Sequence, residues 1–288
     1  MEAIADFLST PVAVACAAVW GAVWGSFFNV VIGRVPRGES IVHPPSRCLS
    51  CQSPVRAWDN VPVLSYLWLR GRCRRCGASI SARYPLVEAL TALVSAALFW
   101  KFAGSDDGEP VAIRLGRFAV YFTFASTLVV LAFIDLDTKR LPDVITLPGT
   151  ALLYLAAFAA HDVSWKERLI GVVVGYLFVR LIADFYYYVL KREGLGLGDG
   201  KLLALMGAVL GWKALPFVVF AASLLGSAIS IPILLVMRAR GRDAGGSQTD
   251  GGDSLRHVEV PFGPFLALGA LVYLFAGRQL MALVLPQG

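Results

Sequence analysis

Charged residues are scarce in this sequence. Asp, Glu, Lys and Arg together make up 16% of the 288 residues, whereas 57% are hydrophobic. The mean hydropathy of +0.66 is far above that of a soluble domain of this length. The composition therefore excludes a soluble protein and predicts an all-α polytopic membrane protein.

Basic residues are absent ahead of the first apolar run, where the only charges are Glu2 and Asp6. That run, residues 11–32, is also too long for the h-region of a signal peptide, so we expect a retained helix. The net charge of +6 does not indicate a nucleic-acid partner, because most positive residues lie in loops beside apolar runs. We expect membrane lipid around the protein and no nucleic acid.

Long apolar runs predict about eight transmembrane helices, since about 20 apolar residues cross the hydrocarbon core. The runs are residues 11–32, 85–103, 118–134, 144–160, 169–190, 201–212, 215–237 and 262–285. Nine arginines from Arg34 to Arg83 place the first long connection in the cytoplasm. Alternation then puts the basic loops at 139–140, 191–192 and 238–242 inside, and the acidic loop at 106–109 outside with both termini.

The chain order indicates three parts. Residues 1–33 form the first transmembrane helix, residues 34–84 a small cytoplasmic domain, and residues 85–288 a transmembrane core. The stretch 241–254 is rich in Gly, Asp and Ser, which predicts a flexible loop. We see no internal repeat of the kind typical of transporters.

Cysteine is rare outside one loop. Four of the five cysteines form Cys48-x-x-Cys51 and Cys73-x-x-Cys76, with 21 residues between the pairs. This spacing fits four thiolates around a tetrahedral zinc ion, and four sulfur ligands leave no open position, so the zinc would be structural. Gly77 suits a tight turn after the last ligand. Two disulfides or a redox pair are the alternative, which a basic and hence cytoplasmic, reducing location disfavours.

Two aspartates lie at the edges of apolar runs. Asp135 ends one run, and Asp199 lies in a glycine-rich stretch between two others. Two carboxylates that share a proton across one water can hydrolyse a peptide bond, because the ionised group accepts the water proton while its protonated partner polarises the carbonyl. We predict that Asp135 and Asp199, both on the cytoplasmic side, form such a pair.

Glycines surround the second aspartate. Gly196, Gly198 and Gly200 remove side chains there and Lys201 follows, so a substrate backbone could approach. The alternative is that Asp199 simply caps the following helix.

Other carboxylates have simpler interpretations. Asp137 and Asp143 are expected to be solvated, and Asp184 to pair with Arg180 four residues earlier. Asp137-Thr138-Lys139 is not Asp-Thr-Gly, which excludes a pepsin-like protease. The glycine stretch has neither GxxxxGK[ST] nor GxGxxG order, which excludes nucleotide binding by this segment.

Asn29 and Glu88 are polar residues inside or bordering apolar runs. From the residues alone, the favoured interpretation is hydrogen bonding between helices that the small residues Gly25 and Ser26 allow to approach.

Six motifs together resemble the bacterial type IV prepilin peptidases, also called prepilin leader peptidase/N-methyltransferases. They are Asp-x5-Leu-Pro from Asp135, Gly-x-Gly-Asp-x-Lys at 196–201, the paired CxxC loop, Gly-Ser-Phe-x-Asn at 25–29, Arg-Tyr-Pro-x-Val-Glu at 83–88, and Pro-Phe-Gly-Pro-Phe at 261–265. The likeness covers nearly the whole chain. Gly-x-Gly-Asp alone is shared with presenilin-like and other intramembrane aspartyl proteases.

The resemblance implies an enzyme of the bacterial inner membrane with two activities. One removes the basic leader of prepilins and pseudopilins on the cytoplasmic side after a glycine, with Asp135 and Asp199 matching the family's catalytic pair. The other methylates the new N-terminal amine with S-adenosylmethionine. The resemblance makes Asn29 and Glu88 candidate contributors to methyl transfer, and no pattern in the sequence indicates an oligomeric state.

Three rival functions differ in what they require. An ion-coupled transporter would place carboxylates near the middle of the bilayer, whereas these aspartates end helices. A zinc-bearing membrane adaptor would make both aspartates replaceable. A peptidase without methyltransferase activity would leave the processed amine unlabelled.

Overall fold

The computed structural model describes residues 2–105, 108–191, 196–243 and 261–277. In these residues the structure is helical, and its only β-pairings are two isolated bridges. The chain divides into two compact units, Met1–Lys166 and Glu167–Gly288, which are described separately. The expected all-α fold of a polytopic membrane protein is confirmed.

Six helices are long and apolar enough to cross a membrane. They are α2 (Pro11–Arg34), α4 (Arg83–Phe102), α5 (Val111–Thr138), α6 (Asp143–Ala156) with its continuation η3 (Ala157–Ala160), α7 (Trp165–Leu190) and α9 (Leu215–Asp243).

Two further apolar runs form shorter helices. They are α8 (Leu197–Leu210, 14 residues) and α10 (Gly263–Val272, 10 residues), which continues as the π-helix η5 (Tyr273–Gly277). All eight expected runs therefore contain helix, but six have the length of a span in the described part of the chain. Most of the predicted flexible loop, part of the acidic loop at 106–109 and the end of the last run lie outside the described residues.

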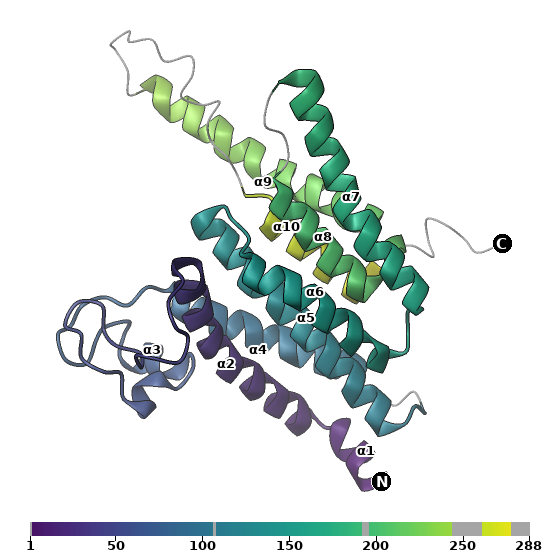
Figure 1. The fold of residues 1–288 in the computed structure, drawn as a ribbon. Coiled ribbons are helices and arrows are strands. Elements are labelled where there is room, and N and C mark those ends of the chain that lie inside the picture. Colours follow the sequence, from purple (N-terminus) through teal and green to yellow (C-terminus); the bar gives the residue numbers. More distant parts are fainter. Residues whose placement is uncertain (1, 106–107, 192–195, 244–260, 278–288) are drawn as a thin grey trace. The chain divides into compact units, whose positions relative to one another are not determined.

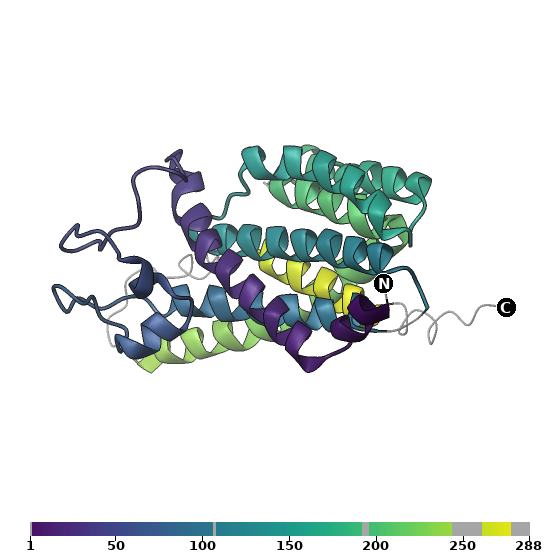
Figure 2. The ribbon, with the colours of Figure 1, turned by 90° about the horizontal axis from the view of Figure 1, so that it is seen from below.

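The first unit also contains short elements at the ends of the long helices. The helix α1 (Glu2–Leu8) precedes α2. The loop between α2 and α4 holds η1 (Val35–Arg37), η2 (Ala57–Asn60) and α3 (Leu64–Trp68). Figures 1 and 2 both show this loop beyond the C-terminal end of α2 and the N-terminal end of α4.

Small residues let α2 and α4 approach closely. Ala17, Gly21 and Gly25 follow one another at intervals of four and are buried. A Cβ on Gly21 would lie 2.6 Å from the carbonyl oxygen of Thr91, and one on Gly25 would lie 2.7 Å from the Cα of Glu88. Small residues at this spacing are typical of tight helix contacts in membranes.

The helix α5 contributes more buried residues to the first unit than any other helix. Phe124, Leu128, Leu131 and Ile134 on this helix are fully buried. Its N-terminal part is tied to neighbouring loops by arginines: Arg114 donates to the carbonyl of Ala103.

A second arginine makes a similar tie nearby. Arg117 donates to the carbonyl of Ala160 at 3.2 Å and pairs with Glu109 at 2.9 Å. These contacts fix the end of α5 that is distant from Asp135.

In the second unit, α8 is buried along most of its length. Every residue from 202 to 210 is buried. A Cβ on Gly171 of α7 would lie 2.6 Å from the carbonyl oxygen of Gly207, so α7 and α8 touch through backbone. The expected pair of Arg180 and Asp184 on α7 is confirmed, with a separation of 3.0 Å.

We expect Gly21→Ala to destabilise the protein, because the added methyl group would overlap the backbone of α4. Overpacking of this kind costs about 1–3 kcal/mol. The matched control is Gly33→Ala on the same helix, where a Cβ meets nothing within 4 Å. Thermal unfolding in detergent should show a lower midpoint for Gly21→Ala alone, and equal midpoints for both variants would contradict the packing argument.

Candidate active site and metal centre

Asp135 lies near the end of α5. The residue is only 5% exposed, and its carbonyl oxygen accepts a bond of 2.8 Å from the backbone N–H of Lys139. Lys139 ends the helix in the left-handed conformation, with φ of 52°. A carboxylate buried to this extent requires either a functional role or a polar partner.

The neighbouring aspartates differ from Asp135 in exposure. Asp137 is exposed and pairs with Arg83 of α4 at 2.5 Å. Asp143 is exposed in the first turn of α6, directly after Pro142. Burial therefore separates Asp135 from Asp137 and Asp143, in agreement with the interpretation of the latter two as solvated residues.

Asp199 lies in the first turn of α8 and is half-buried. The N-cap of this helix is Gly196, whose carbonyl oxygen accepts from the Asp199 backbone N–H at 3.0 Å. Asp199 is therefore three residues past the cap position. The positive end of the helix dipole favours a carboxylate at this place.

The glycines around Asp199 have different surroundings. Among the described residues, a Cβ on Gly196 would meet only the Asp199 carboxylate, at 3.8 Å, so no described residue crowds this side of the turn. A Cβ on Gly200 would lie 3.2 Å from Val179 of α7, so this glycine accommodates a neighbouring helix. Gly198 and Lys201 are half-buried on the same first turns of α8.

The two aspartates belong to different units. Asp135 lies in Met1–Lys166 and Asp199 in Glu167–Gly288. Each is at a helix end beside a short connection, as the sequence predicted, and their pairing stays a prediction.

Asn29 of α2 and Glu88 of α4 both make hydrogen bonds near the start of α4. The Asn29 amide donates to the carbonyl of Tyr84 at 3.0 Å. The Glu88 carboxylate, on a residue 8% exposed, accepts a bond of 2.7 Å from the backbone N–H of Val63 in the loop. Both contacts agree with the packing role that the residues alone favoured.

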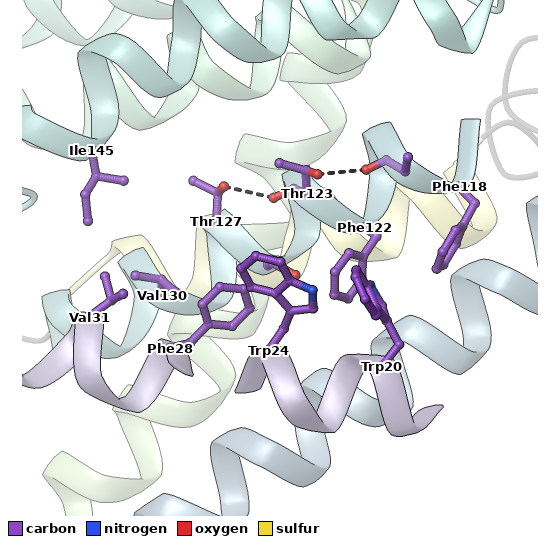
Figure 3. Close-up of a pocket in the computed structure, with 12 residues that line it drawn as sticks. Trp20, Trp24, Phe28, Val31, Phe118, Phe122, Thr123, Thr127, Val130 and Ile145 are labelled. Carbon is purple, nitrogen blue, oxygen red and sulfur yellow. Dashed lines mark hydrogen bonds between the residues drawn. The ribbon is translucent and has the colours of Figure 1, made fainter. Parts of the chain in front are cut away.

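A cavity of about 440 Å³ lies between α2, α5 and α6 in the first unit (Figure 3). Trp20, Trp24 and Phe28 of α2 face Phe122 of α5 across it. The hydroxyls of Thr123 and Thr127 donate to carbonyls of their own helix at 2.8 Å. The described residues that line this cavity are apolar side chains, serine and threonine.

The four loop cysteines converge on one point. Their sulfur atoms all lie within 4.8 Å of one another, and those of Cys48 and Cys76 are 3.8 Å apart. Four sulfurs bound about 2.3 Å from one tetrahedral ion lie about 3.8 Å from each other. None of the cysteines is bridged. Because both pairs meet in one cluster, the geometry fits a four-sulfur metal site better than two separate disulfides.

Two matching turns build this cluster. The N–H of Cys48 donates to the carbonyl of Ser53 at 2.9 Å, and the N–H of Cys73 donates to that of Ala78 at 2.8 Å. The residue after each CxxC has positive φ, 54° at Gln52 and 71° at Gly77. The expected tight turn at Gly77 is confirmed, and Gln52 is its counterpart in the first pair.

Hydrogen bonds favour the thiolate form at Cys51 and Cys73, whereas bonds with the neighbouring sulfurs outweigh one with the Ala78 backbone and raise the pKa of Cys76 to about 11. A bond with the Ser53 side chain, supported by one with its backbone, lowers the pKa of Cys51 to about 6. Backbone groups of Cys76 and Arg75 lower the pKa of Cys73. Thiolate is the form that ligates metal.

Known proteins resemble this chain over most of its length. Residues 19–102 match the Bacterial Peptidase A24 N-terminal domain, and residues 122–231 match the Type IV leader peptidase family. A prepilin leader peptidase/N-methyltransferase of Aeromonas hydrophila is 38% identical over 272 residues, covering 91% of this chain and 82% of that protein. The chain belongs to the type IV leader peptidase family.

Other members of the family give the same picture. The protein of the same name from Myxococcus xanthus is 42% identical over 75% of this chain and 62% of its own length. The one from Pseudomonas aeruginosa is 33% identical over 96% of this chain and 95% of its own length. No solved structure matched the chain.

One contact near Asp135 was not predicted from the sequence. Arg83 was noted as part of a motif and Asp137 as a solvated residue, but they pair across 54 positions of sequence. Local spacing carries no signal for such a pair, because the two residues come together only when α4 packs on α5.

We expect the family member purified from reducing cytoplasm to contain about one metal ion per chain, held by the four loop cysteines. Cys48→Ser and Cys73→Ser should each lower the bound metal strongly, as measured by elemental analysis. Cys16→Ser, which changes a cysteine of α2 outside the cluster, is the control and should keep it. Oxidised, metal-free cysteines in the wild-type protein would contradict the assignment.

Proposed function

We propose that this protein cleaves the leader peptides of type IV prepilins and pseudopilins at the cytoplasmic face of the bacterial inner membrane, with Asp135 and Asp199 as the catalytic pair, and then methylates the new N-terminal amine. One observation carries the peptidase proposal. The region that matches the leader peptidase family, residues 122–231, contains both aspartates.

Two carboxylates can hydrolyse a peptide bond without a metal ion between them. One aspartate, ionised, accepts a proton from the attacking water, and the other, protonated, donates a hydrogen bond to the scissile carbonyl. A pair of this kind holds one proton between two acids, because two like charges cannot both ionise cheaply at short distance. Asp135 is buried near the end of α5, whereas Asp199 lies in the first turn of α8, so the two carboxylates have different surroundings.

The proposed location of the chemistry is the membrane surface. A prepilin combines an apolar membrane helix with a basic leader in the cytoplasm, so its cleavage point lies at the interface. Asp135 precedes the basic pair Lys139 and Arg140 by a few residues, and Asp199 follows Lys191. Under the positive-inside rule, both aspartates then face the cytoplasm. The side of the turn at Gly196 that no described residue crowds leaves room for a substrate backbone.

We further propose that the metal of the loop is zinc and that its role is structural. Four sulfur donors at tetrahedral separations suit zinc, which would crosslink a loop with little apolar core. The ion pair of Arg74 with Asp59 at 2.7 Å adds a second crosslink within this loop. Four sulfur ligands fill a tetrahedral zinc site, so no coordination position is open for catalysis.

Methyl transfer is assigned to the N-terminal part of the chain. Residues 19–102, which match the bacterial N-terminal domain, contain the cysteine cluster together with Asn29 and Glu88. The methyl donor would be S-adenosylmethionine. Glu88 and Asn29 are proposed as contributors because they connect this loop and α2 to the start of α4.

Replacing either catalytic aspartate should abolish cleavage. We expect Asp135→Asn and Asp199→Asn each to lower the rate of prepilin cleavage at least about a hundredfold, the scale of a lost general acid or base. Asp143→Asn and Asp184→Asn are controls, since Asp143 is exposed and Asp184 is half-buried in its ion pair with Arg180. Cleavage by the purified proteins in detergent is followed by the mass of the product. Full activity of either catalytic variant would contradict the proposed catalytic pair.

Methylation can be separated from cleavage in the same reaction. With a labelled methyl donor, the wild-type protein should label the processed pilin. We expect Glu88→Gln and Asn29→Ala to lower labelling more than cleavage. Equal loss of both activities would mean that these two residues serve only packing, and an unlabelled wild-type product would reduce the protein to a peptidase.

A further inference from the structure

We infer that Arg83 is a positioning residue for the peptidase reaction, which fixes the last turns of α5 so that the Asp135 carboxylate is held in its working orientation. This inference rests on the proposed catalytic role of Asp135. All the residues concerned lie in the first compact unit.

Arg83 binds α5 at two places separated by one helical turn. Its Nη1 atom lies 2.6 and 2.5 Å from the carboxylate oxygens of Asp137. Its Nη2 atom donates to the carbonyl oxygen of Phe133 at 3.0 Å, and the guanidinium lies 5.1 Å from the centre of the Phe133 ring. The Arg83 side chain therefore contacts a carboxylate, a backbone carbonyl and an aromatic ring of the same segment of α5.

Helix geometry places Asp135 on the side of α5 opposite the Arg83 contacts. Residues 133 and 137 are four apart and lie on one face of the helix, whereas residue 135 is rotated by about 200° from residue 133. Arg83 therefore holds the turn from one side while Asp135 points to the other. Rotation or fraying of this turn would move the Asp135 carboxylate.

The base of the Arg83 side chain is itself fixed. Arg83 is the first residue of α4. Asn29 of α2 binds the carbonyl of the next residue, Tyr84, and Glu88 one turn later binds the loop at Val63. The first turn of α4 is thus a junction at which α2, the cysteine loop and the end of α5 meet.

An arginine is required for this arrangement. Its planar guanidinium presents several donors in a fixed fork, so one group can serve a carboxylate and a carbonyl together while stacking on a ring. A lysine at this position could neutralise Asp137 but could not also hold the Phe133 carbonyl in the same geometry. Charge alone therefore does not reproduce the contact.

The test compares kinetics of prepilin cleavage for Arg83→Gln, Arg83→Lys and Asp137→Asn. We expect Arg83→Gln to lower kcat on the order of tenfold to a hundredfold with KM within about twofold, because misplacement of a reacting group acts on the chemical step. Arg83→Lys should recover part of the loss. Asp137→Asn should lower kcat less, and the double variant Arg83→Gln/Asp137→Asn should be no worse than Arg83→Gln, since the two residues act as one unit.

The matched control is Arg117→Gln. Arg117 lies on α5 itself and, like Arg83, bonds a carboxylate and a carbonyl, those of Glu109 and Ala160, but near the other end of α5. It should shift thermal unfolding about as much as Arg83→Gln and leave kcat unchanged. A loss of kcat in Arg117→Gln equal to that in Arg83→Gln would overturn the inference, since it would show a general effect of stability.

Two further results would overturn it. One is a folded Arg83→Gln whose kcat matches the wild type, and the other is a raised KM with unchanged kcat, which would mean substrate binding instead. Asp135→Asn keeps this outcome separate from the proposed function. An inactive Asp135→Asn beside an active Arg83→Gln removes only the positioning role, whereas an active Asp135→Asn removes the catalytic pair itself.

Discussion

The close approach of α2 and α4 is the contact on which the first unit depends. Lipid tails are as apolar as leucine, so helices in a bilayer gain little from hiding apolar side chains and associate by tight packing and hydrogen bonds. Gly21 and Gly25 bring the backbones together, and the Ser95 hydroxyl donates to the Ala17 carbonyl at 2.6 Å. This contact also sets the start of α4, where Arg83 and Glu88 reach α5 and the cysteine loop.

The aspartates illustrate how position at a helix end gives a carboxylate its character. Asp135 is buried where α5 terminates, and Asp199 lies where α8 begins, so each is near backbone groups that the helix itself leaves unpaired. Asp137, only two residues from Asp135, is neutralised by Arg83 in a partly exposed ion pair. Nearby carboxylates in one sequence motif therefore differ in burial and in partners, although their residue type is the same.

The cysteine loop is built from two copies of one turn. The bridge between Arg47 and Pro54 corresponds to that between Arg72 and Ser79, and a constant offset of 25 residues relates them. This repeat is present in the sequence, but it is much shorter than the internal repeats of transporters. A loop with so little apolar content gains its order from these paired turns and from the four sulfur ligands they present.

The sequence by itself determined the all-α membrane fold, the eight apolar helical segments, the cysteine cluster and the exposure of Asp137 and Asp143, because hydropathy, CxxC spacing and motif order are local properties of the chain. Only the tertiary structure decided the partners of Arg83, Asn29 and Glu88 and the role of Gly200 against α7. These depend on which segments face each other across 21 to 55 positions of sequence. In a bilayer that choice rests on small differences in packing, which no single segment encodes.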